Sequence, residues 1–417
     1  MGNGAVAPHA AFTKTGHQAQ RVVVNPSDTD ADVITAFHPE SETTRTLLYG
    51  SNYVEIQPST ANSNFGATQT FTFANDVDAI GDVWARVKLT LTAASGGTAD
   101  VKDMALARVI DRVEVMVRNS TWQTMENSDL LVMAKTALHG PDYERFYLQS
   151  NGCLTSTGAL TNTHAQLGSA ATADYIVWVP LTIFNWGGPS RSHLTAGAPH
   201  QSFRIKLTYA AKEVAQGGTA GAAIGTASAL DVSLWARQHV LTNFERDQIR
   251  GNTIAKNLRL TQHAEETAAS QMNIELDSFS LLASHLLIAV EAAGDLAEST
   301  PAILKDAELL LNTSSHSGKL EGSFLATCAG AGMGLEVNDV FDLAYSAEGD
   351  RRFNLYVFPL ASEAYGSDGC PMNRFDTIRL KLNFESGVAP TDKVLVTCVG
   401  TASAIYSKQA ASLQYHS

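Results

Sequence analysis

Closely spaced carboxylates near the start of the chain are the first candidates for chemistry. The run DTDAD, from Asp28, offers three carboxylates that could bind a calcium ion. A calcium loop needs glycine where this chain has Val33, and a bidentate glutamate where it has Pro39. The run therefore predicts a solvated acidic turn.

Glycines and histidines complete the search for a reactive site. The run GAGMG, from Gly330, lacks the GxGxxG spacing, and no helix is predicted after it, so we expect a glycine loop beside a strand. The 12 histidines are scattered, and His193 and His200 share an expected loop with no carboxylate between them. Neither HExxH nor GxSxG occurs. We therefore expect no catalytic residue, no metal ligand and no cofactor, and predict that the protein is not an enzyme.

Two glycosylation sequons, at Asn119 and Asn312, follow expected strands at matching places in the two halves of the chain. Asparagine and serine are also common turn residues. We expect both asparagines to form turns rather than carry sugar.

The composition has few charges for a globular protein. Hydrophobic residues make up 44% and charged residues 17% of the 417 residues, and the formal net charge is −13. This balance lacks the electrostatic attraction that drives nucleic-acid binding. The low charge density indicates that a partner covers much of the surface.

The chain repeats itself around a Pro-Leu pair. Pro180 and Leu181 interrupt the apolar run IVWVPLTIF, and Pro359 and Leu360 interrupt NLYVFPLAS. The alternating run FRIKLTY follows the first pair, and IRLKLNF follows the second. Further upstream, VIDRVEVMV matches ILKDAELLL in the same order. These collinear blocks predict two duplicated domains.

The repeated blocks have the period of two that is typical of β-strands with one buried face. A proline within such a run is expected at a strand end or a bulge, because it cannot donate a ladder hydrogen bond. Helices are scarce in this pattern. NSDLLVMAKTAL has Asn127 or Ser128 as its cap and Pro141 as its stop, and TNFERDQIRG has a capping box from Thr242 to Glu245.

These signals predict an all-β chain of two consecutive eight-stranded jelly-roll β-sandwiches, a double jelly roll, with a few short helices. We expect an extended amino-terminal arm over 1–45, a first jelly roll over 46–245 and a second over 246–417. The arm has no sustained hydrophobic period and cannot form a core of its own. The long loops at 149–172 and 211–229 are expected to face outward.

An ordered set of motifs resembles the major capsid proteins of large eukaryotic (nucleocytoplasmic) DNA viruses. The set is DVWARVKLTL, VIDRVEVMV, YIVWVPLTIFN with RIKLTY, LTNFERDQIR, YVFPLA and MNRFDTIRLKL, and it spans most of the chain. Its most specific parts are the FER junction, with Glu245 and Arg246, and the closing motif, with Arg374 and Asp376. We expect these signature residues to be structural, together with the two Pro-Leu pairs, and Arg374→Ala to lower folding yield or trimer stability.

The resemblance implies a structural major capsid protein whose homotrimers form the pseudo-hexagonal capsomers of an icosahedral DNA virus shell. The implied partners are further copies of the chain, minor capsid and penton proteins, and an internal membrane beneath the shell, without direct nucleic-acid binding. The implied location is the virion capsid, with synthesis and assembly in the host cytoplasm.

A carbohydrate-binding or carbohydrate-cleaving double β-sandwich is the alternative function. Cleavage would need paired carboxylates on one face of a sandwich. The tryptophans in or beside expected strands are read as core or interface anchors rather than as a sugar platform; they are Trp122, Trp178, Trp186 and Trp235.

Overall fold

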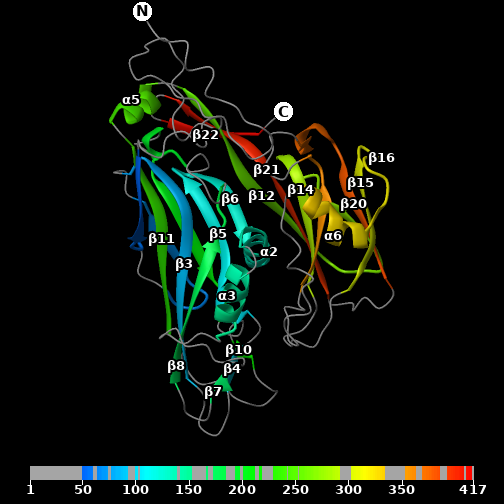
Figure 1. Cartoon of the computed structure of the whole chain (residues 1–417), viewed down its shortest axis with the longest axis horizontal. Coiled ribbons are helices and arrows are strands. Elements are labelled where there is room, and N and C mark those ends of the chain that lie inside the picture. Colours follow the sequence, from blue (N-terminus) through cyan, green and yellow to red (C-terminus); the bar gives the residue numbers. More distant parts are fainter. Residues whose placement is uncertain are drawn as a thin grey trace, which may run out of the picture.

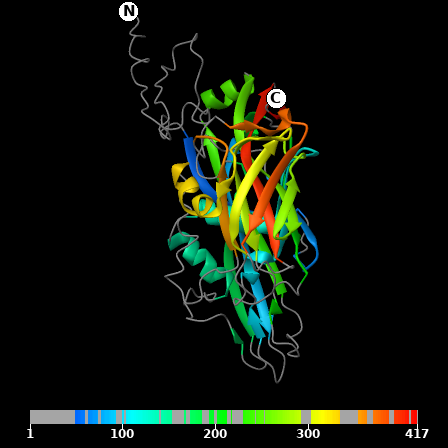
Figure 2. The ribbon, with the colours of Figure 1, turned by 90° about the vertical axis from the view of Figure 1, so that its right-hand side faces the viewer.

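The computed structural model describes residues 49–59, 63–73, 77–92, 99–101, 104–138, 141–152, 166–167, 172–184, 193–197, 201–211, 216–217, 229–241, 243–251, 253–291, 302–333, 353–362, 369–385, 392–407 and 410–415. The expected arm over 1–45 lies outside these residues, as do most residues of the loops at 149–172 and 211–229. The described chain forms two sandwiches that stand side by side (Figure 1; Figure 2).

The first sandwich consists of two four-stranded antiparallel sheets. One sheet has the order β1 (Tyr49–Ile56), β11 (Ala229–Leu241), β3 (Ala79–Thr92), β8 (Thr172–Leu181). The other has the order β2 (Thr68–Thr72), β9 (Phe203–Tyr209), β5 (Ile110–Val117), β6 (Ser120–Glu126). A small accessory sheet pairs β10 (Gln216–Gly217), β4 (Ala99–Val101) and β7 (Gln166–Leu167).

The second sandwich has the same plan. Its first sheet has the order β12 (Ile254–Thr267), β21 (Lys393–Ser407), β14 (Leu282–Glu291), β18 (Phe353–Pro359). Its second has the order β13 (Gln271–Glu275), β20 (Ile378–Phe384), β15 (Leu304–Leu311), β16 (Ser314–Ser315). Three short strands pair at the margins: β17 (Leu320–Glu321) with β15, β19 (Cys370–Pro371) with β14, and β22 (Ala410–Gln414) with β21.

Both sandwiches are jelly rolls. When the eight main strands of each half are numbered along the chain, one sheet has the order 1-8-3-6 and the other 2-7-4-5, in both halves. We call these the 1-8-3-6 sheet and the 2-7-4-5 sheet. The predicted double jelly roll is therefore confirmed. The repeated Pro-Leu segments lie at the end of the sixth strand in each half, β8 and β18, as duplication requires.

Alternation along the strands builds the two cores. In β9, Phe203, Ile205 and Leu207 point inward and are buried, while the intervening polar side chains are partly exposed. The counterpart strand β20 has the same pattern. Phe203 packs edge-on against Phe73, with ring centroids 4.9 Å apart.

The four sheets stand in a row (Figure 1). From left to right the row contains β3 and β11, then β5 and β6, then β12, β21 and β14, and finally β15, β16 and β20. The 2-7-4-5 sheet of the first jelly roll thus faces the 1-8-3-6 sheet of the second.

The helices differ from the sequence predictions in three places. Helix α2 (Asn127–Ala137) forms as expected, but its N-cap is Glu126 rather than Asn127 or Ser128. Helix α2 ends at Ala137, before the predicted stop at Pro141, but the same proline begins α3 (Pro141–Ser150), which the sequence did not predict, because proline fits the first position of a helix. The run GAGMG is not a loop beside a strand, since Gly330 lies within α6 (Gly322–Gly332).

Within the described ranges, two further α-helices occur, one between the two sandwiches and one between β4 and β5. Helix α5 (Asn243–Gly251) follows the first sandwich, as predicted from the FER motif. Thr242 and the side chain of Glu245, which define its expected capping box, lie outside the described residues. The short helix α1 (Ala105–Arg108) precedes β5. No helix in the described part of the chain is long and apolar enough to cross a membrane.

Candidate functional site: the junction between the two jelly rolls

The two jelly rolls meet where β6 and the start of α2 lie against β12 and β21. We call this contact the junction. Its side chains come from positions more than 100 residues apart in the sequence, so folding of both sandwiches is needed to assemble it. The junction therefore brings buried polar side chains of both jelly rolls into contact.

Asp129 is the centre of the junction. Its side chain is 1% exposed and lies in the first turn of α2, where the helix dipole stabilises a negative charge. The hydroxyl of Thr397 donates to Asp129 Oδ1 at 2.6 Å, and the ring Nδ1 of His263 lies 3.1 Å from the same oxygen. The backbone N–H of Glu126 donates to Oδ2 at 3.2 Å. The carboxylate of Asp129 thus binds β12 and β21 of the second jelly roll and caps α2.

Two ionisable groups beside Asp129 have shifted pKa values. Burial lowers the pKa of His263, but the hydrogen bond to Asp129 and the charges of Asp129, Glu265 and Glu126 outweigh burial and leave this pKa above its ordinary value. Burial raises the pKa of Glu126, with the charge of Asp111 adding to the rise and that of Arg112 opposing it. The junction therefore favours a protonated histidine over a neutral one.

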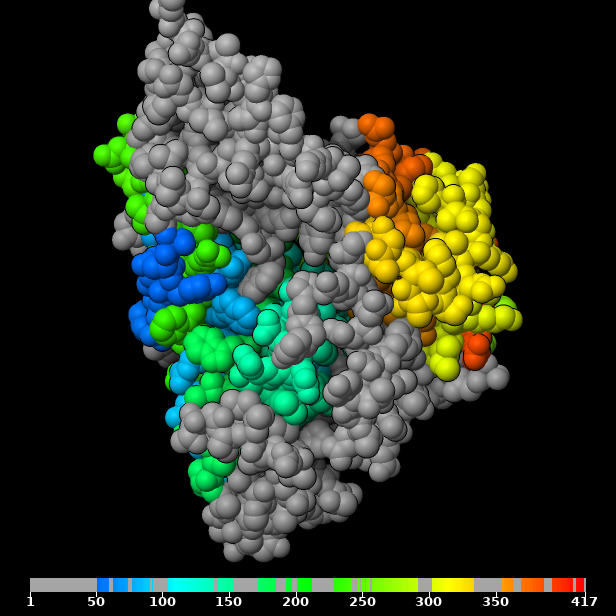
Figure 3. All heavy atoms as spheres, viewed as in Figure 1, coloured from blue at the N-terminus to red at the C-terminus, as the bar shows by residue number. Residues whose placement is uncertain are grey.

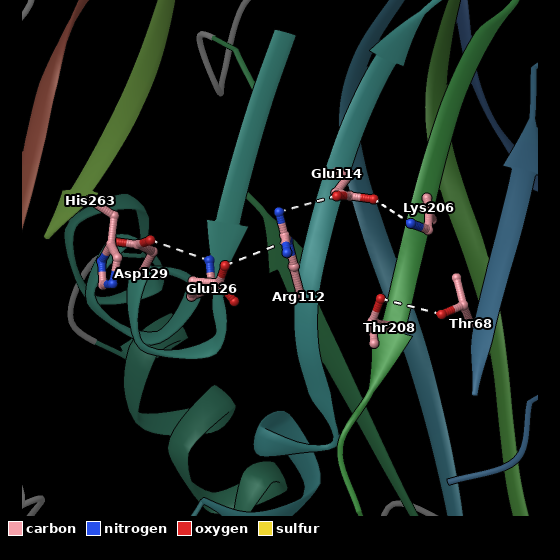
Figure 4. A network of polar contacts seen from close by, with 8 residues as sticks. All are labelled: Thr68, Arg112, Glu114, Glu126, Asp129, Lys206, Thr208 and His263. Carbon is pink, nitrogen blue, oxygen red and sulfur yellow. Dashed lines mark hydrogen bonds and ion pairs between the residues drawn. The ribbon is translucent and has the colours of Figure 1, made fainter. Parts of the chain in front are cut away.

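A row of ion pairs leads from the junction across the outer face of the 2-7-4-5 sheet (Figure 4). Arg112 Nη2 lies 3.2 Å from Glu114 and its Nε 3.5 Å from Glu126, and Lys206 Nζ lies 2.7 Å from Glu114. Glu114 and Lys206 are directly paired across β5 and β9. Their counterparts in the second jelly roll, Glu308 and Lys381, are also directly paired, at 3.9 Å. Duplication has therefore preserved a cross-strand ion pair as well as the core.

A pair of neutral hydrogen bonds and an ion pair extend the junction beyond Asp129. Gln123, 3% exposed, donates through Nε2 to the hydroxyl of Thr261 at 3.0 Å and accepts from the backbone N–H of Phe184 at 3.1 Å. At the other end, Arg108 Nη2 lies 2.8 Å from Glu291 Oε1, and both side chains are nearly buried. Removing either member of these pairs would leave a buried polar group unsatisfied.

His193 is a structural part of the junction. The hydroxyl of Tyr406, at the end of β21, is 2.9 Å from His193 Nδ1 and accepts from the backbone N–H of Leu194 at 3.3 Å. The imidazole stacks on Phe203 with a 4.9 Å centroid distance. His200, the other histidine of the expected loop, lies outside the described residues.

A cleft of about 450 Å³ opens beside the junction between β6 and β12. The ionisable groups among its lining residues are Glu126, His263 and Tyr415, so Glu126 is its single carboxylate. The lining thus lacks the carboxylate pair that glycoside cleavage uses. Among the residues that the structure describes, no group of three or more His, Cys, Asp or Glu side chains could hold a metal ion.

Comparison with known proteins identifies the fold. No family model and no curated protein matches the sequence. VP54 of PBCV-1 is 15% identical and superimposes with a TM-score of 0.68 over 88% of this chain and 97% of its own. The Faustovirus major capsid protein is 10% identical, with a TM-score of 0.62 over 86% and 91%. A chain of the Sputnik virophage is 10% identical, with a TM-score of 0.53 over 92% and 93%. The chain has the double jelly-roll fold of these viral proteins.

The Pro-Leu pairs of this double jelly roll lie on edge strands. Pro180 pairs with Trp84 at the end of β8, and Leu181 is fully buried. Pro359 pairs with His285 as the last residue of β18, and the backbone N–H of Leu360 donates to Ser284 at 2.9 Å. Edge positions near strand ends are where a proline costs least, because no ladder donor is lost.

Arg246 of the FER motif locks α5 to the first jelly roll. Its Nε and Nη2 lie 2.6 Å and 2.8 Å from the two carboxylate oxygens of Asp78, which is almost fully buried. The same carboxylate accepts from the backbone N–H of Leu241 at 2.7 Å. The hydrogen bond to Asp78 raises the pKa of Arg246 above its ordinary value. The bidentate pair thus fixes the end of β11 and the helix that follows it.

The closing motif of the double jelly roll is shaped by Asn312. This residue is in the left-handed region, with φ of 48°, and its Oδ1 accepts from the backbone N–H groups of Asp376 and Thr377 at 2.8 and 3.1 Å. Arg374 and Asp376 have exposed side chains, and Phe375 packs partly against the core. In this motif the side chain that holds the backbone is therefore that of Asn312.

Asn119 lies at the equivalent turn between β5 and β6. The preceding residue, Arg118, has a φ of 58°, and Arg204 Nη2 donates to Asn119 Oδ1 at 3.4 Å. Both sequon asparagines thus occupy tight turns after strands.

Sequence reasoning missed Asp129, His263 and Asp78. An acidic residue three positions after Glu126 is a recognisable capping signal and could have drawn attention to Asp129. Nothing local in the sequence marks its contacts with His263 and Thr397, because those residues join only through the three-dimensional fold.

Proposed function

We propose that this protein is a structural major capsid protein whose homotrimers form the pseudo-hexagonal capsomers of an icosahedral DNA virus shell. The observation that carries the proposal is the double jelly-roll fold shared with a Faustovirus major capsid protein over 86% of this chain. A row of four sheets with two unpaired outer faces supports it, since such faces suit contacts between copies. No catalytic step is part of this function.

The partners and location follow from that role. Neighbouring copies, minor capsid and penton proteins, and a membrane beneath the shell are the proposed partners, and the net charge of −13 argues against direct nucleic-acid binding. The proposed location is the virion capsid, after synthesis and assembly in the host cytoplasm. The chain is proposed to divide into an arm over 1–45 beneath the shell and jelly rolls over 46–245 and 246–417.

Light scattering with electron microscopy of the purified protein tests the proposal. A homotrimer, alone or within closed shells, is the expected result. A stable monomer at micromolar concentration under all buffer conditions would contradict it. Protease treatment of assembled particles should spare the arm and cut the loops at 149–172 and 211–229, and the reverse pattern would reject that orientation.

A further inference from the structure

Two faces of the double jelly roll remain unpaired. The junction uses the 2-7-4-5 sheet of the first jelly roll and the 1-8-3-6 sheet of the second. The 1-8-3-6 sheet of the first and the 2-7-4-5 sheet of the second stand at opposite ends of the row (Figure 1). Because the two jelly rolls share one topology, the free faces belong to one 1-8-3-6 sheet and one 2-7-4-5 sheet. The two faces that meet in the junction belong to the same two kinds of sheet.

The free face of the first jelly roll carries an aromatic cleft. Each strand of the sheet supplies one aromatic side chain: Tyr53 from β1, Trp84 from β3, Trp178 from β8 and Trp235 from β11. Together with α3 they line a cleft of about 630 Å³. Trp178 and Trp235 meet edge to face at 5.9 Å, and Tyr53 is 50% exposed. Aromatic side chains gathered in an open cleft are typical anchors of protein interfaces.

The free end of the second jelly roll carries the counterpart of the junction helix. Helix α2 packs on β5, β6 and β8, and α6 packs on β15, β17 and β18. β15 and β18 are the counterparts of β5 and β8, and β17 pairs with β15 where the end of β6 pairs with β5. A glutamate, Glu126 or Glu321, is the N-cap of each helix. The third helical residue is Asp129 in α2 and Phe324 in α6. Asp129 is 1% exposed because the second jelly roll covers it, whereas Phe324 is 44% exposed.

A second apolar side chain is uncovered beside Phe324. Val109, before β5, is fully buried, but its counterpart Ile303, before β15, is 55% exposed. Gly322 at the start of α6 touches the backbone of Leu304, where a Cβ would lie 1.8 Å from the carbonyl oxygen. This close approach places Ile303 next to the start of α6. We call Ile303, Phe324 and the exposed Cys328 the α6 face.

The aromatic cleft corresponds to the surface that Asp129 contacts within the chain. Trp84 and His285 are equivalent positions, because they pair with the equivalent prolines Pro180 and Pro359. Two residues further along, Arg86 and Leu287 are therefore also equivalent, and their partners on the last strand of the same sheet are Ser233 and Thr397. Thr397 is the residue that donates to Asp129. Its counterpart on the free face is thus Ser233, and Trp235 lies two residues along the same face of β11, so an indole ring stands beside the position that Asp129 contacts in the junction.

We propose that the α6 face of one copy docks into the aromatic cleft of a second copy, with Phe324 packing against Trp235. This contact between two chains has the arrangement of the junction within one chain. Apolar side chains take the place of the polar side chains around Asp129. A head-to-tail contact of this kind uses different surfaces on the two copies, and a rotation of about 120° between successive copies closes it into the ring of a homotrimer. The inference rests on the proposed homotrimer and names the surfaces that meet in it.

Cysteine cross-linking tests the contact in the full-length chain. In a Cys153→Ser and Cys328→Ser background, which leaves only the buried Cys370 and Cys398, Phe324→Cys is combined with Trp235→Cys, and the protein is oxidised. Bonds between copies are expected, giving covalent dimers and trimers on non-reducing gels. Each variant with one introduced cysteine, and Trp235→Cys combined with Lys393→Cys on the exposed side of β21, should stay at the monomer position.

A substitution pair provides a second measurement that does not depend on the cysteines. Phe324→Glu would place a charge in the cleft, and the concentration needed for half-maximal assembly should rise about 30-fold or more, as for the loss of an interface anchor. Phe324→Leu keeps an apolar side chain of similar volume and should assemble nearly as well as the parent. Circular dichroism of both variants would establish that the fold is retained.

The possible results separate this contact from the proposed function. If the parent forms trimers or shells, but the cysteine pair does not link copies and Phe324→Glu assembles like the parent, the contact is wrong and the capsid function stands. If the parent stays monomeric, both fall. If chitohexaose or another oligosaccharide quenches the tryptophan fluorescence of the parent but not of Trp235→Ala, and Trp235→Ala assembles normally, the cleft is a sugar site and the docking proposal is overturned.

Discussion

At the scale of single residues, a few polar side chains hold segments that hydrophobic packing alone would leave unfixed. Asp78 is the clearest case, because its buried carboxylate binds both the end of β11 and the side chain of Arg246. A buried charge without its partner is costly, so the two residues depend on each other.

Replacing Arg246 by alanine should lower the free energy of unfolding by about 2 to 3 kcal/mol, since it removes a charge-assisted hydrogen bond and leaves Asp78 buried without its counter-ion. Denaturant titration followed by circular dichroism would measure the change. Arg250→Ala, an exposed position in the last turn of the same helix, is the matched control and should change stability by less than about 0.5 kcal/mol.

The turn at Asn312 offers a second residue-level prediction. Asn312→Ala would strain a left-handed backbone and remove the acceptor for two N–H groups, so the loss of stability should be about 1 to 3 kcal/mol. Asn312→Gly relieves the strain and should lose less. Thermal unfolding of both, beside Arg374→Ala, would rank the three. A larger loss for the exposed Arg374 than for Asn312 would show that the arginine fixes this motif after all.

At the scale of elements, the sequence predicted the repeated strands correctly because one buried face imposes a period of two, as in β9 and β20. Helices α3 and α6 were missed for local reasons. Pro141 follows the end of α2 as expected but also begins α3, and the glycine-rich end of α6 hides an apolar face that packs on β18. The junction could not be predicted at all, since Asp129 meets residues from distant strands only after both jelly rolls fold.

The contact between α2 and β12 should depend on pH. The pKa of His263 is raised in the folded protein, so the stabilisation by the protonated imidazole is complete below its unfolded value of about 6.5 and is lost as pH rises through the folded value. The parent should therefore lose stability relative to His263→Gln as pH rises above about 6.5. Denaturant unfolding of both proteins across this range would measure the difference.

Two features separate this pH effect from others nearby. Burial also raises the pKa of Glu126, but Glu126 is present in both the parent and His263→Gln, so the difference between these two proteins reports on His263. Asp129→Asn removes the charge that holds the imidazolium and should flatten the same pH dependence. An unchanged pH profile in either variant would mean that the His263 contact does not contribute to the stability of the junction.

At the scale of the whole molecule, net charge and apolar contact oppose each other. Each chain carries a formal charge of −13, so copies that approach one another repel. The contact proposed between Phe324 and Trp235 is apolar and is not weakened by salt screening. Assembly should therefore be governed by how far ionic strength reduces the repulsion between chains.

Raising sodium chloride from about 20 mM to about 500 mM shortens the screening length from more than about 20 Å to less than about 5 Å, which suppresses repulsion between neighbouring chains. The concentration required for half-maximal assembly should fall across this series, as followed by multi-angle light scattering. Sodium acetate at equal ionic strength should act similarly if screening is the cause, whereas a difference between the salts would indicate specific ion binding. Dissociation at high salt would show instead that ion pairs between copies dominate the interface, and the apolar contact could then not be the main source of cohesion.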